Sequence, residues 1–289
     1  MDQEALQIEP IGSYRSQWGE GPIWHDDALL YVDIENGRVI RLEPETGEEA
    51  VCDLKDEVGR VGTVVPRASG GLLVAGDDGF FSISDSGEVT SLGDPESNKP
   101  NNRFNDGKCS PDGHFFAGTI SLVKKEGDAR LYQLSKDGKI RSAYSPVTNS
   151  NGIAWNAAGD KMFYIDTPTK KVLAFPYKDG QLWTPKTIID TSNYEASPDG
   201  MAIDENDNLW VAFCHGACVI NYDTKTGKEI RKIDVPCLET TACAFGGKSL
   251  DTLYVTTGIH KSEVEKDAGL IFQVTGLGVK GQKAHSYLG

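Results

Sequence analysis

The sequence predicts an all-β protein built as a six-bladed β-propeller. Three observations favour this fold: a short apolar, β-prone segment recurs six times, its copies are evenly spaced, and helical periodicity is hard to find. The bulky central residues of successive copies lie about 42 to 47 residues apart, the period expected of four-stranded blades. These anchor residues are Tyr31, Leu73, Phe116, Phe163, Trp210 and Tyr254.

The repeating unit is clearest in residues 197–213. Residues 200–203 form an apolar run, residues 204–208 a polar turn cluster, and residues 209–213 a second apolar, β-prone run. Two such runs around a polar turn predict a β-hairpin. Asp199 stands just ahead of the first predicted strand, as either a turn former or a group that the strand end delivers to a site.

The ring is expected to close by mixing the two chain ends in one blade. We expect residues 6–14 to supply the outer strand of the blade that ends near Val274. A solenoid of the same units would need polar caps at its ends, and a β-sandwich would not give this spacing. Residues 1–289 are therefore predicted to form one propeller domain.

Composition excludes several classes of partner. The formal net charge of −14 argues against nucleic acid or an anionic membrane. No run of roughly 18 apolar residues is present, and the N-terminus lacks the features of a secretory signal, so we expect a cytoplasmic protein that does not bind membranes. In that compartment the cysteines are expected to be free thiols, namely Cys52, Cys109, Cys214, Cys218, Cys237 and Cys243.

Polar residues recur about eleven positions before the anchors, at the predicted entrance of each innermost strand. Four of the six equivalent positions carry, exactly or within one residue, a side chain with an oxygen donor: Glu20, Asn105, Asn151 and Asp199. The other two positions fall at Gly62 and near Thr241. Propeller symmetry would bring these strand ends together around the axis.

Such a ring of oxygens predicts a central site for a divalent cation. Carboxylates and carboxamides suit Ca²⁺, Mg²⁺ or Mn²⁺ better than a metal that prefers thiolates. Without a cation the carboxylates of Glu20 and Asp199 would repel, and one of them would have to bind a proton. The alternative is that the Asn-Gly and Asp-Gly pairs are ordinary turn dipeptides. Four such residues in phase favour the shared site.

The segment around Asn105 offers a second kind of chemistry. Arg103 precedes Asn105 by two residues, so both point to the same side of an extended segment. The guanidinium of Arg103 could bind a substrate carboxylate, a hydroxyl or a developing oxyanion, and the alternative is a surface salt bridge. Asp106 is either an orienting residue for Asn105 or a turn residue.

Other motifs give little support to competing chemistry. The five histidines show no H-x-H or H-E-x-x-H pairing, and neither a G-x-S-x-G elbow nor a nucleotide-binding glycine motif occurs. Cys214 and Cys218 form a single C-x₃-C that could bind metal, but without a second pair they are expected to be ordinary thiols. Lys124 and Lys125 are expected to be solvated loop charges.

The chain resembles the regucalcin (senescence marker protein)/gluconolactonase/luciferin-regenerating enzyme family. The motifs that carry the resemblance span nearly the whole chain in order: GEGPIW with LLYVDI, NNRFNDGK with FFAGT, NGIAW with FYIDT, PDGMAID with LWVAF, AFGG with LYVTT, and VTGLGVKG. The resemblance implies a six-bladed propeller with one divalent cation in its channel. Ca²⁺ is the first expectation, and Zn²⁺, Mn²⁺ or Mg²⁺ are the alternatives.

The resemblance also implies roles for individual residues. Glu20, Asn151 and Asp199 would ligate the metal, Arg103 and Asn105 would contact the substrate, and Asp199 would act as general base. The expected activity is hydrolysis of a sugar lactone to its aldonic acid. The alternatives are another metal-dependent esterase or phosphotriesterase, or a calcium-binding propeller without catalysis. The loop at residues 120–128 is shorter and more basic than in vertebrate members, which leaves the sugar undetermined.

Overall fold

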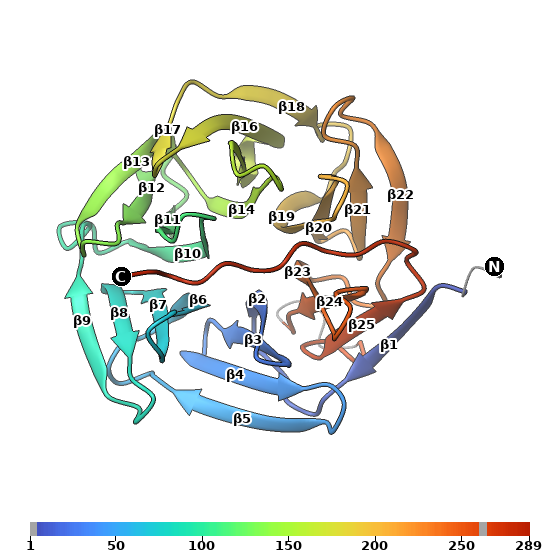
Figure 1. Cartoon of the computed structure of the whole chain (residues 1–289), viewed down its shortest axis with the longest axis horizontal. Coiled ribbons are helices and arrows are strands. Elements are labelled where there is room, and N and C mark those ends of the chain that lie inside the picture. The colour runs from blue at the N-terminus through green and yellow to red at the C-terminus, as the bar shows by residue number, and fades with distance from the viewer. Residues whose placement is uncertain (1–4, 260–264) are drawn as a thin grey trace.

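The recurring apolar segments form six antiparallel sheets around a central axis, as the computed structural model shows for residues 5–259 and 265–289 (Figure 1). The predicted six-bladed propeller is confirmed. Met1 to Glu4, part of the segment used to judge a signal sequence, and His260, one of the five histidines, lie outside the described residues.

The blades follow one another along the chain. Blade one contains β2 (Gly19–His25), β3 (Ala28–Asp33), β4 (Arg38–Glu43) and β5 (Glu48–Asp53). Blade two contains β6 (Val61–Pro66), β7 (Leu72–Gly76), β8 (Gly79–Ile83) and β9 (Val89–Gly93). Blade three contains β10 (Asn102–Cys109), β11 (Phe115–Ser121), β12 (Ala129–Leu134) and β13 (Ile140–Val147).

The second half of the ring repeats this order. Blade four contains β14 (Ser150–Trp155), β15 (Lys161–Asp166), the 3₁₀ turn η1 (Thr167–Thr169), β16 (Lys171–Lys178), β17 (Gln181–Leu182) and β18 (Lys186–Asp190). Blade five contains β19 (Ser197–Ile203), β20 (Leu209–Cys214), β21 (Cys218–Tyr222) and β22 (Glu229–Asp234). Blade six contains β23 (Thr240–Gly246), β24 (Thr252–Thr257), β25 (Ile271–Thr275) and β1 (Gln7–Ile11).

The predicted anchors all lie on the second strand of their blades, and each is buried. Both faces of this strand pack against neighbouring blades, so its sequence is almost continuously apolar instead of alternating. Bulky aromatic and β-branched side chains suit such a strand because they fill the space between twisted sheets. The even spacing of the anchors therefore reflects one core position repeated in each blade.

The predicted hairpin of blade five is confirmed, with one change in its boundary. β19 begins at Ser197, so Asp199 lies inside the strand and not ahead of it. Asp204 organises the turn that follows. One of its carboxylate oxygens accepts hydrogen bonds from the backbone of Asn206 and Asn208, and the other accepts a bond of 3.0 Å from the indole of Trp210.

The two chain ends meet in blade six, as predicted. β1 pairs antiparallel with β25 over its whole length and forms the outer strand of blade six, beside β25 in Figure 1. Val274 pairs with Ile8 in this register. This pairing covers the hydrogen-bonding edge that β25 would otherwise expose.

The chain after β25 crosses one end of the propeller channel (Figure 1). Residues 282–285 line a small cavity together with the final residues of the inner strands, among them Trp24, Lys108 and Trp155. Tyr287 then donates a backbone hydrogen bond of 2.9 Å to Pro66, and Leu288 donates one of 3.1 Å to Gly113. The tail, which leaves blade six, is therefore hydrogen-bonded to blades two and three.

Two sequence expectations about the whole chain can be compared with the structure. All six cysteines are free thiols, as expected. Among the described residues, we find no helix with the length and apolar character needed to cross a membrane.

Deleting the chain up to Gly12 should lower the melting temperature by about 5 °C or more, because β25 would lose the strand that covers its edge. Thermal unfolding followed by circular dichroism measures this change. A shorter deletion that ends before Leu6 is the control and should leave the melting temperature unchanged. An unaltered melting temperature in the longer deletion would contradict the closure.

Candidate functional site

A β-bulge interrupts the pairing of the innermost strand with its neighbour in all six blades of the described chain. A bulge bends its strand and changes the direction of nearby side chains. The bulges fall at the positions that the sequence spacing selected: between Glu20 and Ile23, Val61 and Thr63, Phe104 and Gly107, Asn151 and Ile153, Pro198 and Met201, and Thr240 and Ala242. The polar residues thus occupy one repeated structural position.

The glycines that follow Asn151 and Asp199 permit neighbouring inner strands to approach closely. A Cβ atom on Gly152 would lie 2.8 Å from the backbone oxygen of Asp199, and one on Gly200 would lie 2.3 Å from the Cβ of Ala242. Both glycines lie within strands. The alternative that these dipeptides are ordinary turns is therefore wrong, since they serve close packing between blades.

The sequence-predicted site residues all line one cavity of about 770 Å³ at the entrance of the inner strands. They come from four blades, and each is at most 7% exposed: Glu20, Arg103, Asn105, Asn151 and Asp199. The structure therefore brings together every residue that the sequence selected for the site. Asn149, Lys124, Cys214 and His215 also line this cavity, and the spacing argument did not select them.

Asn105 connects the guanidinium of Arg103 to the neighbouring blade. Its Oδ1 accepts a hydrogen bond of 2.9 Å from Nη1 of Arg103. Its Nδ2 donates to the backbone oxygen of Ser150 at 2.8 Å and to Oδ1 of Asn151 at 3.2 Å. Arg103 and Asn105 thus lie on the same side, as expected, and they also bind each other. Arg103 is buried in the cavity wall instead of forming a surface salt bridge.

Much of the Arg103 guanidinium is left for a ligand. Nη1 makes the hydrogen bonds that this side chain gives to the described residues, one to Asn105 and one of 2.8 Å to the backbone oxygen of Phe104. Nε has no partner among those residues. Burial lowers the pKa of Arg103 to about 10, so the group is still cationic at neutral pH.

Three buried carboxyl groups stand close together at the axis. Burial, then the charge of Asp106, raises the pKa of Glu20 to about 8. Burial, then the charges of Glu20 and Asp106, raises the pKa of Asp199 well above its ordinary value. Burial also raises the pKa of Asp106, although its Oδ1 accepts a hydrogen bond of 2.7 Å from the backbone of Gly107. Both shifts at the axial pair favour the protonated acids unless a cation compensates.

The donor set fits a hard divalent cation. Glu20 and Asp199 supply carboxylate oxygens whose mutual repulsion a cation would remove. Nδ2 of Asn151 donates a hydrogen bond of 2.9 Å to Thr167, which fixes the carboxamide with Oδ1 on the side of Asn105. Two carboxylates and a carboxamide oxygen are ligands that Ca²⁺ accepts.

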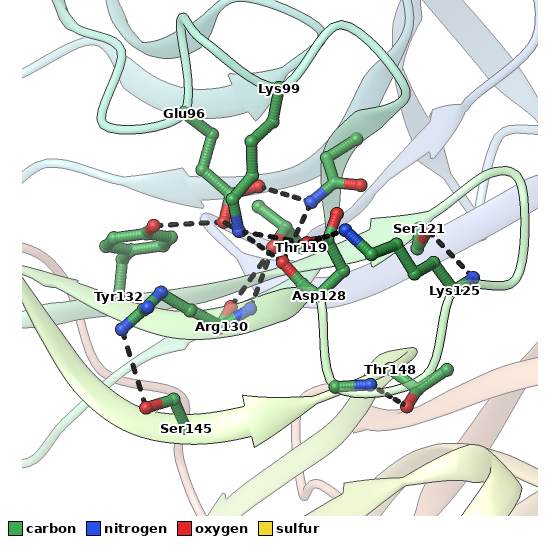
Figure 2. A network of polar contacts seen from close by, with 12 residues as sticks. Glu96, Lys99, Thr119, Ser121, Lys125, Asp128, Arg130, Tyr132, Ser145 and Thr148 are labelled. Carbon is green, nitrogen blue, oxygen red and sulfur yellow. Dashed lines mark hydrogen bonds and ion pairs between the residues drawn. The ribbon is translucent and has the colours of Figure 1, made fainter.

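The loop at residues 120–128 forms part of the cavity rim and is held by a polar network (Figure 2). Nζ of Lys125 lies 3.1 Å from the Asp128 carboxylate, and Nζ of Lys99 also contacts Asp128. The backbone nitrogen of Gly127 donates to Thr148 at 3.0 Å. Both loop lysines are exposed, as expected, but Lys124 also lines the cavity, and none of the described residues forms a hydrogen bond or ion pair with its side chain.

A further polar group at the rim was not foreseen as a group. Cys214 ends β20 and His215 follows it, and both contact the carboxylate of Glu239, which precedes β23. Cys218, the other member of the C-x₃-C, is not part of this group. The sequence signal was the C-H-G-A-C segment, but its partner lies in the next blade, which a local motif cannot reveal.

Comparison with known proteins identifies the family. The SMP-30/gluconolactonase/LRE-like region matches residues 18–259 of the chain. The chain belongs to this family. Regucalcin from Danio rerio is 36% identical to it over 99% of both chains. The resemblance inferred from the sequence motifs is thereby confirmed.

Solved structures of this family share the fold. A luciferin-regenerating enzyme superposes with a TM-score of 0.90 at 27% identity and covers 98% of this chain and 100% of its own. A calcium-binding protein, regucalcin from Agrobacterium tumefaciens, gives a TM-score of 0.87 at 24% identity, with 95% and 94% coverage. Family membership supports a lactonase-like or calcium-binding function for the propeller.

Metal-free protein should lose stability as the pH rises from about 4.5 to about 8. Glu20 is ionised above about 4.5 in the unfolded chain but keeps its proton up to about 8 in the folded one, so the stability it contributes at low pH is lost in this window. Excess Ca²⁺ should reverse the loss. The melting temperature in EDTA and in Ca²⁺, measured at several pH values across the window, checks this.

Glu20→Gln serves as the control for the pH experiment, because glutamine cannot ionise but occupies similar space. In this variant the melting temperature in EDTA should depend less on pH. An identical pH dependence in the variant and the native protein would show that Glu20 is not the group responsible.

Proposed function

We propose that the protein is a metal-dependent lactonase that hydrolyses a five- or six-membered sugar lactone to its aldonic acid. The observation that carries the proposal is the convergence of Glu20, Asn151 and Asp199 with the Arg103–Asn105 pair in one cavity. Its volume of about 770 Å³ lies within the usual range for small-molecule sites, roughly 300–1,000 Å³. Family membership supports the same activity.

Glu20, Asn151 and Asp199 would hold the divalent cation, with Ca²⁺ as the first candidate. When bound, the cation supplies Lewis-acid polarisation of a carbonyl oxygen. Glu20 and Asp199, which would share its charge, would then both be ionised at neutral pH. We also propose that the protein acts in the cytoplasm, where its six free thiols would stay reduced.

Asp199 acts as the general base in this proposal. A carboxylate oxygen takes a proton from water as the water oxygen attacks the lactone carbonyl carbon. The ring C–O bond then breaks, and the proton passes to the departing ring oxygen, which becomes the hydroxyl of the aldonic acid. Asp199 belongs to the buried strand β19, so its position relative to the cavity is fixed before the substrate binds.

Arg103 stabilises negative charge on the substrate. Its free N–H groups donate to the carbonyl oxygen as charge develops there, or to a sugar hydroxyl. Asn105 holds the guanidinium through the 2.9 Å hydrogen bond and is itself fixed to blade four through Ser150 and Asn151. The two residues that the sequence assigned to substrate binding thus work as one unit.

Replacing the proposed base tests the mechanism. Asp199→Asn should lower kcat by about 10²- to 10⁴-fold, because asparagine cannot accept the proton from water. Proton release from glucono- or xylonolactone, with and without EDTA, measures the rate. Asp234→Asn is the matched control, since Asp234 lies on the outer strand of the same blade with an 83% exposed side chain, and it should hydrolyse at the native rate.

The melting temperature separates catalysis from folding in this experiment. In EDTA, Asp199→Asn should melt no lower than the native protein, because the substitution removes one of the repelling buried carboxyl groups. Hydrolysis at a near-native rate by a well-folded Asp199→Asn protein would contradict the assignment of Asp199 as the general base. Metal binding without hydrolysis of any lactone by the native protein would instead favour the calcium-binding alternative.

Two adjacent lysines of the loop, Lys124 and Lys125, allow a matched test of substrate recognition. Lys124→Gln should raise KM by about 10-fold with little change in kcat, the value of one hydrogen bond from a charged donor to a sugar oxygen. Lys125→Gln should leave both constants unchanged, since its ammonium group already binds Asp128. Steady-state kinetics on one lactone compares them, and equal effects would argue against a role for the loop in binding.

A further inference from the structure

Three side chains that bind metals in other proteins meet at the rim of the cavity. Cys214 ends β20 of blade five, His215 follows it, and Glu239 directly precedes β23 of blade six. One ligand atom from each lies within 4.8 Å of the others. An isolated antiparallel bridge joins the backbones of Cys214 and Glu239, so the two blades fix this arrangement.

Glu239 is the buried centre of the group. Its side chain is 0% exposed, and its Oε2 lies 2.7 Å from Nδ1 of His215 and 3.4 Å from Sγ of Cys214. Its Oε1 has no hydrogen-bond partner among the described residues. Burying a carboxylate oxygen without a hydrogen-bond partner costs free energy, and a bound ligand would offset that cost. This unpartnered Oε1 belongs to the same carboxylate on which Cys214 and His215 converge through Oε2.

The group opens toward the cavity. Cys214 and His215 both line it, and the His215 side chain is 48% exposed. A ligand held by the three side chains would therefore have a free position on the cavity side. This is the pattern of three protein ligands and one open position that accessible Zn²⁺ sites show.

The donor atoms differ from those of the axial ring. Sulfur and imidazole nitrogen favour Zn²⁺ and related transition metals, whereas Glu20, Asn151 and Asp199 offer only oxygens. We propose that Cys214, His215 and Glu239 form a second metal site, for Zn²⁺ or a similar borderline-soft divalent ion. Its three residues are different from those of the axial oxygen site, and the proposal does not depend on the lactonase proposal.

Metal binding would change the protonation of two side chains. The Cys214 thiol loses its proton to solvent and binds as a thiolate. His215 transfers its proton from Nδ1 to Nε2, so that Nδ1 offers its lone pair to the metal in place of donating to Glu239. Glu239 then binds through an oxygen that the hydrogen bonds no longer occupy. The alternative is a hydrogen-bonded group in which Glu239 only orients His215.

Cobalt is the probe, because thiolate ligation of Co²⁺ gives a sulfur-to-metal charge-transfer band that oxygen ligation does not. Chelator-treated full-length protein is titrated with Co²⁺ while its absorption spectrum is recorded. The proposal expects one equivalent of Co²⁺ with this band, and displacement of the band by Zn²⁺. Glu20→Gln, which weakens the axial oxygen site, should keep the band.

Variants of the three ligands complete the experiment. Cys214→Ser should abolish the band, and His215→Gln and Glu239→Gln should each weaken Co²⁺ binding by at least the roughly 10- to 100-fold that outer contacts of a metal are worth. Cys218→Ser, the other cysteine of the C-x₃-C, is the matched control and should behave as the native protein. His215→Gln changes a half-exposed side chain in a turn, so it tests the proposal even if the buried variants unfold.

Three results would overturn the second site. These are Co²⁺ binding without a charge-transfer band, a band that survives in folded Cys214→Ser protein, and unchanged Co²⁺ affinity in His215→Gln protein. Each would leave Glu239 as an orienting partner in a hydrogen-bonded group.

Discussion

The constraint that governs the candidate site is the electrostatic repulsion among the carboxyl groups that the closed ring of blades buries at its axis. Glu20 and Asp199 lie on inner strands of different blades, and closing the ring buries both beside Asp106. Their pKa values rise because neither water nor a protein cation neutralises them sufficiently. A cation bound between these carboxyl groups would offset this cost, and the cation and the ring of strands would then stabilise each other.

Most of the fold, and the convergence of the candidate site residues in one cavity, could be predicted because one blade repeats. Counting back from Trp210 reaches the same bulged position as counting back from Tyr31, so residues far apart in sequence were assigned to one place. Blades two and six occupy the same position without adding a ligand. There Thr63 and Thr241 donate hydrogen bonds to the neighbouring blades, at 2.9 Å to Gly107 and 2.5 Å to Gly19.

Contacts between blades that break the repeat could not be predicted. Glu239 meets Cys214 and His215 only because two neighbouring blades are fastened at their rims, and no spacing rule relates these residues. The position of Lys124 on the cavity depends on how a loop is tied to Asp128 and Thr148, which is again outside the repeat. The repeated motifs therefore predicted the residues around the axis but not those at the rim of the cavity.

The C-terminal tail makes the two ends of the channel different. Residues 282–285 lie across the ends of the inner strands, opposite the entrance that Glu20 and Asp199 border. The cavity at the tail end measures about 70 Å³, against about 770 Å³ at the entrance beside Glu20 and Asp199, so the roomier approach to the axis lies at that entrance. If the protein is the lactonase proposed above, the neutral lactone and its anionic product would share that entrance, and accumulated product would compete with substrate for it.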